Sequence, residues 1–268
     1  MLIGLCGDKG APGVTTSALA IASAWPGPAI VVEASPAGGD LAIRLRPKGS
    51  VLPETPTVLS VVTAARGADG TDAVANHSHG LNSTTTVVPG PAMAEQLTNI
   101  GDWTPLADAL SRSSVPVFTD LGHLHGASAT IAVAARADLV VVVSRPDMAS
   151  VVRARERLIR AATDLARMRG TAPRLFPLLV STSRHGQADV ADLSAVLAET
   201  PARPFLVDAG FLAHDPAAVR RLEAGEEPTG RLARTALMRT ARVVASQIER
   251  VATAPAQATA GSASGAGS

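Results

Sequence analysis

The chain has 268 residues, 46% of them hydrophobic, so it can bury a sizeable core, and its length suits one large α/β domain. Its formal net charge of +1 excludes a global positive field that would attract nucleic acid or anionic lipid. The single cysteine, Cys6, excludes an intramolecular disulfide and fits a cytoplasmic protein, and the sequence shows neither an export signal nor an apolar run near the length of about 18 residues that a bilayer requires.

Seven apolar runs, several of them rich in β-branched residues, predict strands. They are residues 2–6, 29–33, 84–90, 115–120, 138–144, 174–181 and 204–209. Most are apolar at consecutive positions, which is typical of parallel strands that are covered on both faces. Helical patterns fill the gaps between them. These are residues 15–24, 57–66, 91–99, 104–112, 127–136, 149–169, 188–199, 216–224 and 230–252.

Strand and helix therefore alternate through most of the chain. This order predicts an α/β fold with a doubly wound, mostly parallel sheet, helices on both faces, and a ligand beyond the carboxyl ends of the strands. The domain is expected to span residues 1–252. Residues 253–268 are rich in Ala, Gly and Ser and predict a disordered tail, and residues 67–83 predict a flexible surface loop.

The turn after the first predicted strand has the sequence KGAPGVTT, residues 9–16. A helix that begins just after glycines offers backbone N–H groups and the positive end of its dipole, and both attract phosphate. The turn resembles the deviant phosphate loop of the MinD/ParA family of P-loop ATPases, K-G-G-x-G-K-[ST]-[ST]. This resemblance implies a P-loop NTPase-like fold that binds ATP or ADP with Mg²⁺. The implied nucleotide-binding residues are Lys9, Gly10, Ala11, Pro12, Gly13, Val14, Thr15, Thr16 and Asp120.

Two positions of this loop depart from the family pattern in ways that affect chemistry. Val14 stands where the family has the lysine that neutralises the β and γ phosphates, and losing such a donor costs about 3 to 4 kcal/mol where charge develops. Pro12 offers no backbone N–H to a phosphate. The resemblance also implies that Lys9 reaches across a homodimer and that Thr15 holds magnesium.

A second segment, VVEASPAGGDLA at residues 31–42, resembles the family's D-x-D-P-x-x-G-D stretch, whose carboxylates orient magnesium and the attacking water. Glu33 and Ser35 take the places of these two carboxylates, and Ser35 cannot act as an acidic residue. Asp120 resembles the family's Walker B aspartate, although a helix or turn cap is an alternative role for it. The implied magnesium ligands are Thr15, Glu33 and Asp120, and no catalytic residue is assigned.

The resemblance continues to about residue 250. Residues 137–158 resemble the family's strand, proline turn and long helix. Residues 208–228 resemble its G-x-I-P-x-D-P segment, which lies near the base of a bound nucleotide, with Ala213 in place of the proline.

Two further patterns suggest other kinds of site. The H-x-H pairs His77/His79 and His123/His125 lack an obvious third metal ligand. Solvated histidines are favoured at His77 and His79, which fall in the predicted loop, and structural or solvent roles at His123 and His125. One predicted helix is distinctly basic, and a solvated helix face is favoured over DNA contact because acidic residues are interspersed. Its arginines are Arg153, Arg155, Arg157, Arg160, Arg167 and Arg169.

These observations favour a degenerate MinD/ParA-type protein that positions or scaffolds other components, with weakened nucleotide binding and weak or absent ATP hydrolysis. Such a protein would form a homodimer and recruit a protein partner. Within the family it most resembles the CpaE/TadZ branch, implicated in placing pilus-assembly machinery. The alternatives are an active ParA-like partitioning ATPase that binds DNA nonspecifically, and a metabolic enzyme built on the same sheet.

Overall fold

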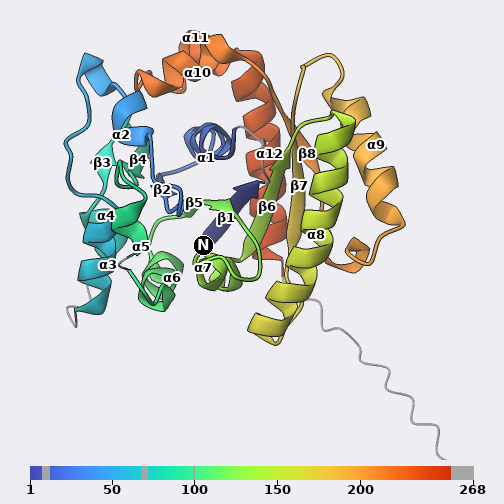
Figure 1. The fold of residues 1–268 in the computed structure, drawn as a ribbon. Helices are drawn as coiled ribbons and strands as arrows, with labels where there is room; N and C mark the ends of the chain where they lie inside the picture. Colours follow the sequence, from blue (N-terminus) through green and yellow to red (C-terminus); the bar gives the residue numbers. More distant parts are fainter. Residues whose placement is uncertain (8–12, 68–71, 99, 255–268) are drawn as a thin grey trace, which may run out of the picture.

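The structure is a computed structural model that describes residues 1–7, 13–67, 72–98 and 100–254 (Figure 1). The strands are β1 (Leu2–Gly7), β2 (Ala29–Glu33), β3 (His79–Gly80), β4 (Thr85–Val88), β5 (Val117–His123), β6 (Leu139–Ser144), β7 (Leu175–Ser181) and β8 (Gly210–Ala213). The helices up to β6 are α1 (Val14–Ser23), α2 (Leu41–Arg44), η1 (Pro47–Gly49), α3 (Val58–Arg66), α4 (Ala73–Asn76), α5 (Glu95–Thr98), α6 (Thr104–Arg112) and α7 (Ile131–Arg136). The later ones are α8 (Met148–Arg169), α9 (Gly186–Ala198), η2 (Arg203–Phe205), α10 (Pro216–Glu223), α11 (Gly230–Ala233) and α12 (Ala236–Thr253).

The eight strands form one sheet in the order β3-β4-β2-β5-β1-β6-β7-β8. Every pairing is parallel except that of β3 with β4. The order reverses around β1, and β1 therefore lies between β5 and β6 in the middle of the sheet. Ligands of open α/β sheets bind at the carboxyl ends of the strands at such a switch point. The predicted fold class is confirmed.

Each face of the sheet carries its own hydrophobic core. Side chains of β1 alternate between the two cores: Leu2 and Cys6 enter one, and Ile3 and Leu5 enter the other. Helices α3 to α9 cover the first face, and α1, α2 and α10 to α12 cover the second (Figure 1). Burial on both faces explains why the strands are apolar at consecutive positions rather than at every second one.

The prediction for the last strand is wrong. Within residues 204–209 the structure has the end of η2, whose turn Phe205 closes with a backbone hydrogen bond to Ala202, and one isolated bridge from Leu206 to Leu175; the strand is residues 210–213. Phe205 and Leu206 are apolar because they pack against the first core. Hydrophobicity indicated burial here, and burial does not require a strand.

Four other predicted segments differ from the structure. The predicted helix 230–252 is two helices, α11 and α12, because Thr235 accepts a hydrogen bond from the backbone of Met238 and starts a new helix. The predicted loop 67–83 contains α4 and β3 among its described residues, with Asp72 capping α4. The predicted helices 91–99 and 127–136 begin later, at α5 and α7.

The predicted tail is only partly covered. Thr253 belongs to α12, and residues 255–268 lie outside the described residues. No helix within the described ranges is both long and apolar enough to cross a membrane.

Candidate functional site

Helix α1 begins at the centre of the sheet with a glycine. Gly13 has φ 111°, a left-handed conformation that L side chains rarely adopt, so the turn into α1 requires a glycine there. The first hydrogen bond of the helix runs from the Ser17 N–H to the Gly13 carbonyl at 2.7 Å. The N–H groups of residues 14–16 precede it, and such groups together with the helix dipole attract anions.

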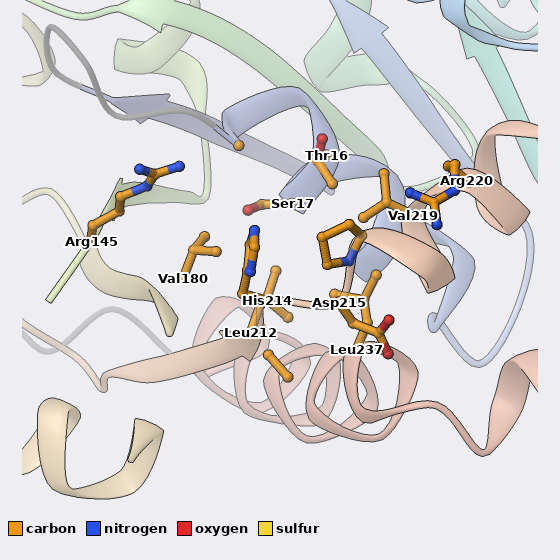
Figure 2. Close-up of a pocket in the computed structure, with 13 residues that line it drawn as sticks. Thr16, Ser17, Arg145, Val180, Leu212, His214, Asp215, Val219, Arg220 and Leu237 are labelled. Atoms are coloured by element: carbon orange, nitrogen blue, oxygen red, sulfur yellow. The ribbon is translucent and has the colours of Figure 1, made fainter. Parts of the chain in front are cut away.

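A cavity of about 330 Å³ opens beside this helix end (Figure 2). One wall is the start of α1, and the opposite wall is the end of β8 with the first turn of α10. The lining residues from α1 and its turn are Gly13, Thr16 and Ser17, and those from β8 and α10 include Leu212, Ala213, His214, Pro216 and Val219. The wall formed by residues 212–216 belongs to the segment that resembles the family's base-side motif, so the structure brings that segment and the phosphate-loop helix together.

Ser17 gives this cavity an unsatisfied polar group. Ser17 is fully buried, and its hydroxyl has no hydrogen-bond partner within the described parts of the chain. Ser17 and His214 both line the cavity (Figure 2). A buried hydroxyl without a partner costs about 1 to 3 kcal/mol, so a ligand that bonds to Ser17 would recover part of that cost.

Thr15 and Asp120 meet on the other side of the helix start. The Thr15 hydroxyl donates a hydrogen bond to Oδ2 of Asp120, and the Gly122 N–H donates to Oδ1 at 2.8 Å. Asp120 is almost fully buried, and burial raises its pKa while the bond from Thr15 opposes the rise. The structure therefore brings together two of the three predicted magnesium ligands. Asp120 lies within β5 and caps no helix, but its bond from the N–H two residues later agrees with the alternative role of a turn cap.

Glu33 is paired with Asp120 in the register of β2 and β5, but its carboxylate already accepts hydrogen bonds from the backbone. It accepts backbone N–H bonds from Gly90 at 2.9 Å, Asp40 at 3.0 Å and Leu41 at 3.3 Å. Burial raises the pKa of Glu33 to about 7, although these three donors favour the charged form. Glu33 thus fastens Asp40, Leu41 and Gly90 to the end of β2.

Gly39 and Ser35 are held tightly in the same corner. A Cβ at Gly39 would overlap the Glu33 carboxylate and lie 2.8 Å from the Gly90 Cα. Ser35 packs against Gly122, since a Cβ on that glycine would lie 2.5 Å from the Ser35 hydroxyl oxygen. The side chain in the place of the family's water-positioning carboxylate is therefore a short hydroxyl against a glycine turn.

Val14 occupies the lysine position as a core residue. It is 9% exposed and belongs to the hydrophobic cluster beneath α1. Its side chain supplies packing and no charge to the start of the helix.

Arg44 is a residue of this region that the sequence did not single out. Its guanidinium donates to the Thr16 hydroxyl at 3.1 Å and forms ion pairs with Asp40 and Glu223. It thereby joins α1, α2 and α10. The four-residue spacing from Asp40 was the only local signal for it.

The remaining sequence-predicted residues are the first part of the phosphate loop and the two histidine pairs. Lys9, Gly10, Ala11 and Pro12 lie outside the described residues. The prediction of solvated side chains at His77 and His79 is wrong in part, because both are half-buried and bond to the backbone carbonyls of Ala73 and Pro56, each at 2.8 Å. His123 and His125 are exposed. Within the described ranges, His, Cys, Asp and Glu side chains form no cluster of three that could hold a metal.

The basic helix α8 uses some of its arginines inside the fold. Arg157 donates to the Leu124 carbonyl and Arg169 to the Ala137 carbonyl. Arg155 pairs with Glu156 on the same helix. These three arginines of the helix therefore have partners within the protein.

Comparison with known proteins identifies the fold of this chain through solved structures. No family model and no curated protein sequence matches the chain. Among solved structures, a ParA family ATPase from Chlorobium tepidum has a TM-score of 0.67 at 15% identity, over 91% of this chain and 96% of that one. The MinC:MinD cell division complex of Aquifex aeolicus matches with a TM-score of 0.64 at 14% identity, over 93% and 95%. The septum site-determining protein MinD of Pyrococcus horikoshii, complexed with Mg-ADP, matches with a TM-score of 0.61 at 13% identity, over 94% and 97%. The chain has the fold of the ParA and MinD ATPases, as the sequence resemblance predicted.

Proposed function

We propose that this chain is a degenerate MinD/ParA-type protein that binds a nucleotide and acts as a positioning or scaffolding factor, with ATP hydrolysis slow or absent. One observation carries the proposal: the cavity between the start of α1 and residues 212–216 is retained, while the residues expected to perform hydrolysis are replaced or occupied. Binding without fast turnover suits a protein whose output is a conformation or a complex.

The residues around the cavity fit ATP or ADP with Mg²⁺. The start of α1 supplies backbone N–H groups, and Ser17 supplies a buried hydroxyl that lacks a partner among the described residues. Thr15 and Asp120 would hold the magnesium ion, with Glu33 beside them on β2. The relative from Pyrococcus horikoshii was solved with Mg-ADP, which supports this choice of ligand.

Two substitutions support slow hydrolysis. Val14 is buried and apolar where the family has a lysine that stabilises charge on the phosphates. Ser35 has no carboxylate to orient an attacking water. A missing preorganised donor of this kind costs about 3 to 4 kcal/mol in the transition state, or two to three orders of magnitude in rate.

The protein would form a homodimer and recruit another protein, as in the CpaE/TadZ branch, which is implicated in placing pilus-assembly machinery. The match to a MinC:MinD complex supports a protein partner, because that relative was solved with one. The structural use of Arg157 and Arg169 supports a protein partner over DNA.

The test is to measure Mg-ADP and Mg-ATP binding by calorimetry, and phosphate release, for the wild type and for Val14→Lys. We expect wild-type binding with little turnover, and binding at least about tenfold tighter in the variant because the ammonium returns to the phosphates. Val14→Met is the matched control, since it adds a chain of similar length without charge.

Robust wild-type hydrolysis that Lys9→Ala abolishes would contradict the proposal and establish an active ATPase. DNA binding that weakens steeply with salt would point instead to a partitioning role. No nucleotide binding by the wild type would remove the central claim.

A further inference from the structure

Arg145 stands where the sheet's switch point meets the cavity. It follows directly on Ser144, the last residue of β6, and β6 pairs with β1, the strand that leads to α1. Arg145 lines the cavity together with Gly13, Thr16 and Ser17. Figure 2 shows Arg145 and Arg220 at opposite sides of this cavity, with Thr16, Ser17 and His214 between them.

The guanidinium of Arg145 is exposed and uncommitted within the described part of the chain, where it forms neither a hydrogen bond nor an ion pair. Arg44, which contacts Thr16 of α1, is fully engaged by Thr16, Asp40 and Glu223. Arg220 of α10 is also exposed and unpaired in the described chain, but it lies on the opposite side of the cavity from Arg145 (Figure 2). Arg145 is thus a cation beside the helix start that no carboxylate of the described chain neutralises.

We infer that Arg145 supplies the phosphate-binding charge of this pocket, in place of the lysine that Val14 replaces. Three observations on different elements converge on an anionic ligand. Arg145 directly follows β6, the N–H groups come from the start of α1, and the unsatisfied Ser17 hydroxyl belongs to the same cavity lining. A planar guanidinium can hold two phosphate oxygens at once, which an ammonium point charge cannot.

The ligand class is a nucleoside di- or triphosphate whose phosphates lie between α1 and Arg145. Its base would then lie toward Leu212 and Val219, the apolar part of the lining. Arg145 follows strand β6 and is not part of α1. It can therefore bind the phosphates, but it does not restore a cation at the position of Val14 in the phosphate loop. The inference rests on the proposed function and makes one residue responsible for its affinity.

The experiment compares two probes, Mg-ADP and adenosine, by calorimetry with purified wild type, Arg145→Gln and Arg145→Lys. Loss of a charge-assisted bond predicts that Arg145→Gln weakens Mg-ADP binding about 10- to 100-fold and leaves adenosine binding unchanged. Arg145→Lys should fall between the two, since it keeps the charge and loses the fork. Arg160→Gln, which removes an exposed arginine of α8 away from the cavity, is the matched control.

A double variant, Val14→Lys with Arg145→Gln, is expected to regain Mg-ADP affinity, because a cation again stands at the phosphates. Wild-type Mg-ADP affinity in Arg145→Gln would overturn the inference and leave nucleotide binding intact. An equal loss of ADP and adenosine would also overturn it, since the residue would then hold the base or the fold. A wild type that binds neither probe would overturn the inference and the proposed function together.

Discussion

The two sides of helix α1 differ in how their polar groups are satisfied. On the side of β8 and α10 a cavity remains, with the Ser17 hydroxyl unpaired among the described residues and Arg145 uncommitted there. On the side of β2 and β5 the carboxylates of Glu33 and Asp120 are bonded to the protein itself. Polar groups left unsatisfied cost stability unless a ligand completes them, whereas satisfied groups stabilise the fold. The side of β8 and α10 therefore keeps polar groups free for a ligand, whereas the carboxylates on the side of β2 and β5 already have partners in the protein.

The largest loss of stability is expected from Gly39→Ala, on the side of β2 and β5. The new Cβ would overlap the Glu33 carboxylate and crowd the backbone of Gly90, so we expect a loss of about 3 kcal/mol or more in unfolding free energy. Urea denaturation measures it. Gly80→Ala is the control, because nothing lies within 4 Å of the position that its new methyl group would take. Equal stability of the two variants would show that the Glu33 corner is loosely packed.

The pH dependence of stability sharpens the role of Glu33. Its pKa rises from 4.5 to about 7 on folding, so the folded state holds the proton more tightly than the unfolded state does. The resulting stabilisation is present below pH 4.5 and is lost as the pH rises through 7. Relative to Glu33→Gln, the wild type should therefore lose up to about 3 kcal/mol of unfolding free energy between about pH 4.5 and 8. Parallel pH profiles of the two proteins would contradict this.

Filling the cavity tests the binding side. Val219 is half-buried on α10 and lines the cavity, so Val219→Phe should exclude part of a ligand while leaving the Glu33 corner unchanged. We expect Mg-ADP and adenosine to bind about tenfold more weakly, or about 1.4 kcal/mol, with little change in unfolding free energy. Unchanged binding of both would mean that the ligand lies elsewhere.

The smallest effect is expected from Ser17→Ala. Removing a buried hydroxyl that lacks a partner among the described residues should stabilise the ligand-free protein by about 1 kcal/mol. The same change should weaken Mg-ADP binding several-fold, because the ligand loses a hydrogen bond. Thermal unfolding with and without Mg-ADP measures both. Destabilisation of the ligand-free protein would show that Ser17 serves the fold.

The sequence by itself determined the layered parallel sheet, because apolar runs at strand length and helical patterns between them are local properties of the chain. Its resemblance to a known family also grouped Thr15, Glu33 and Asp120 as one site, which composition and periodicity alone did not show. It located the departures at Val14 and Ser35 directly.

Only the tertiary structure decided what those residues do. Thr15 and Asp120 are 105 positions apart, and their hydrogen bond depends on how α1 packs on β5. Glu33 points its carboxylate at Gly90, 57 positions away, which no local pattern could show. The cavity between Ser17 and His214 and the exposure of Arg145 likewise arise from packing between distant segments, because side-chain partners are set by space and not by spacing in the chain.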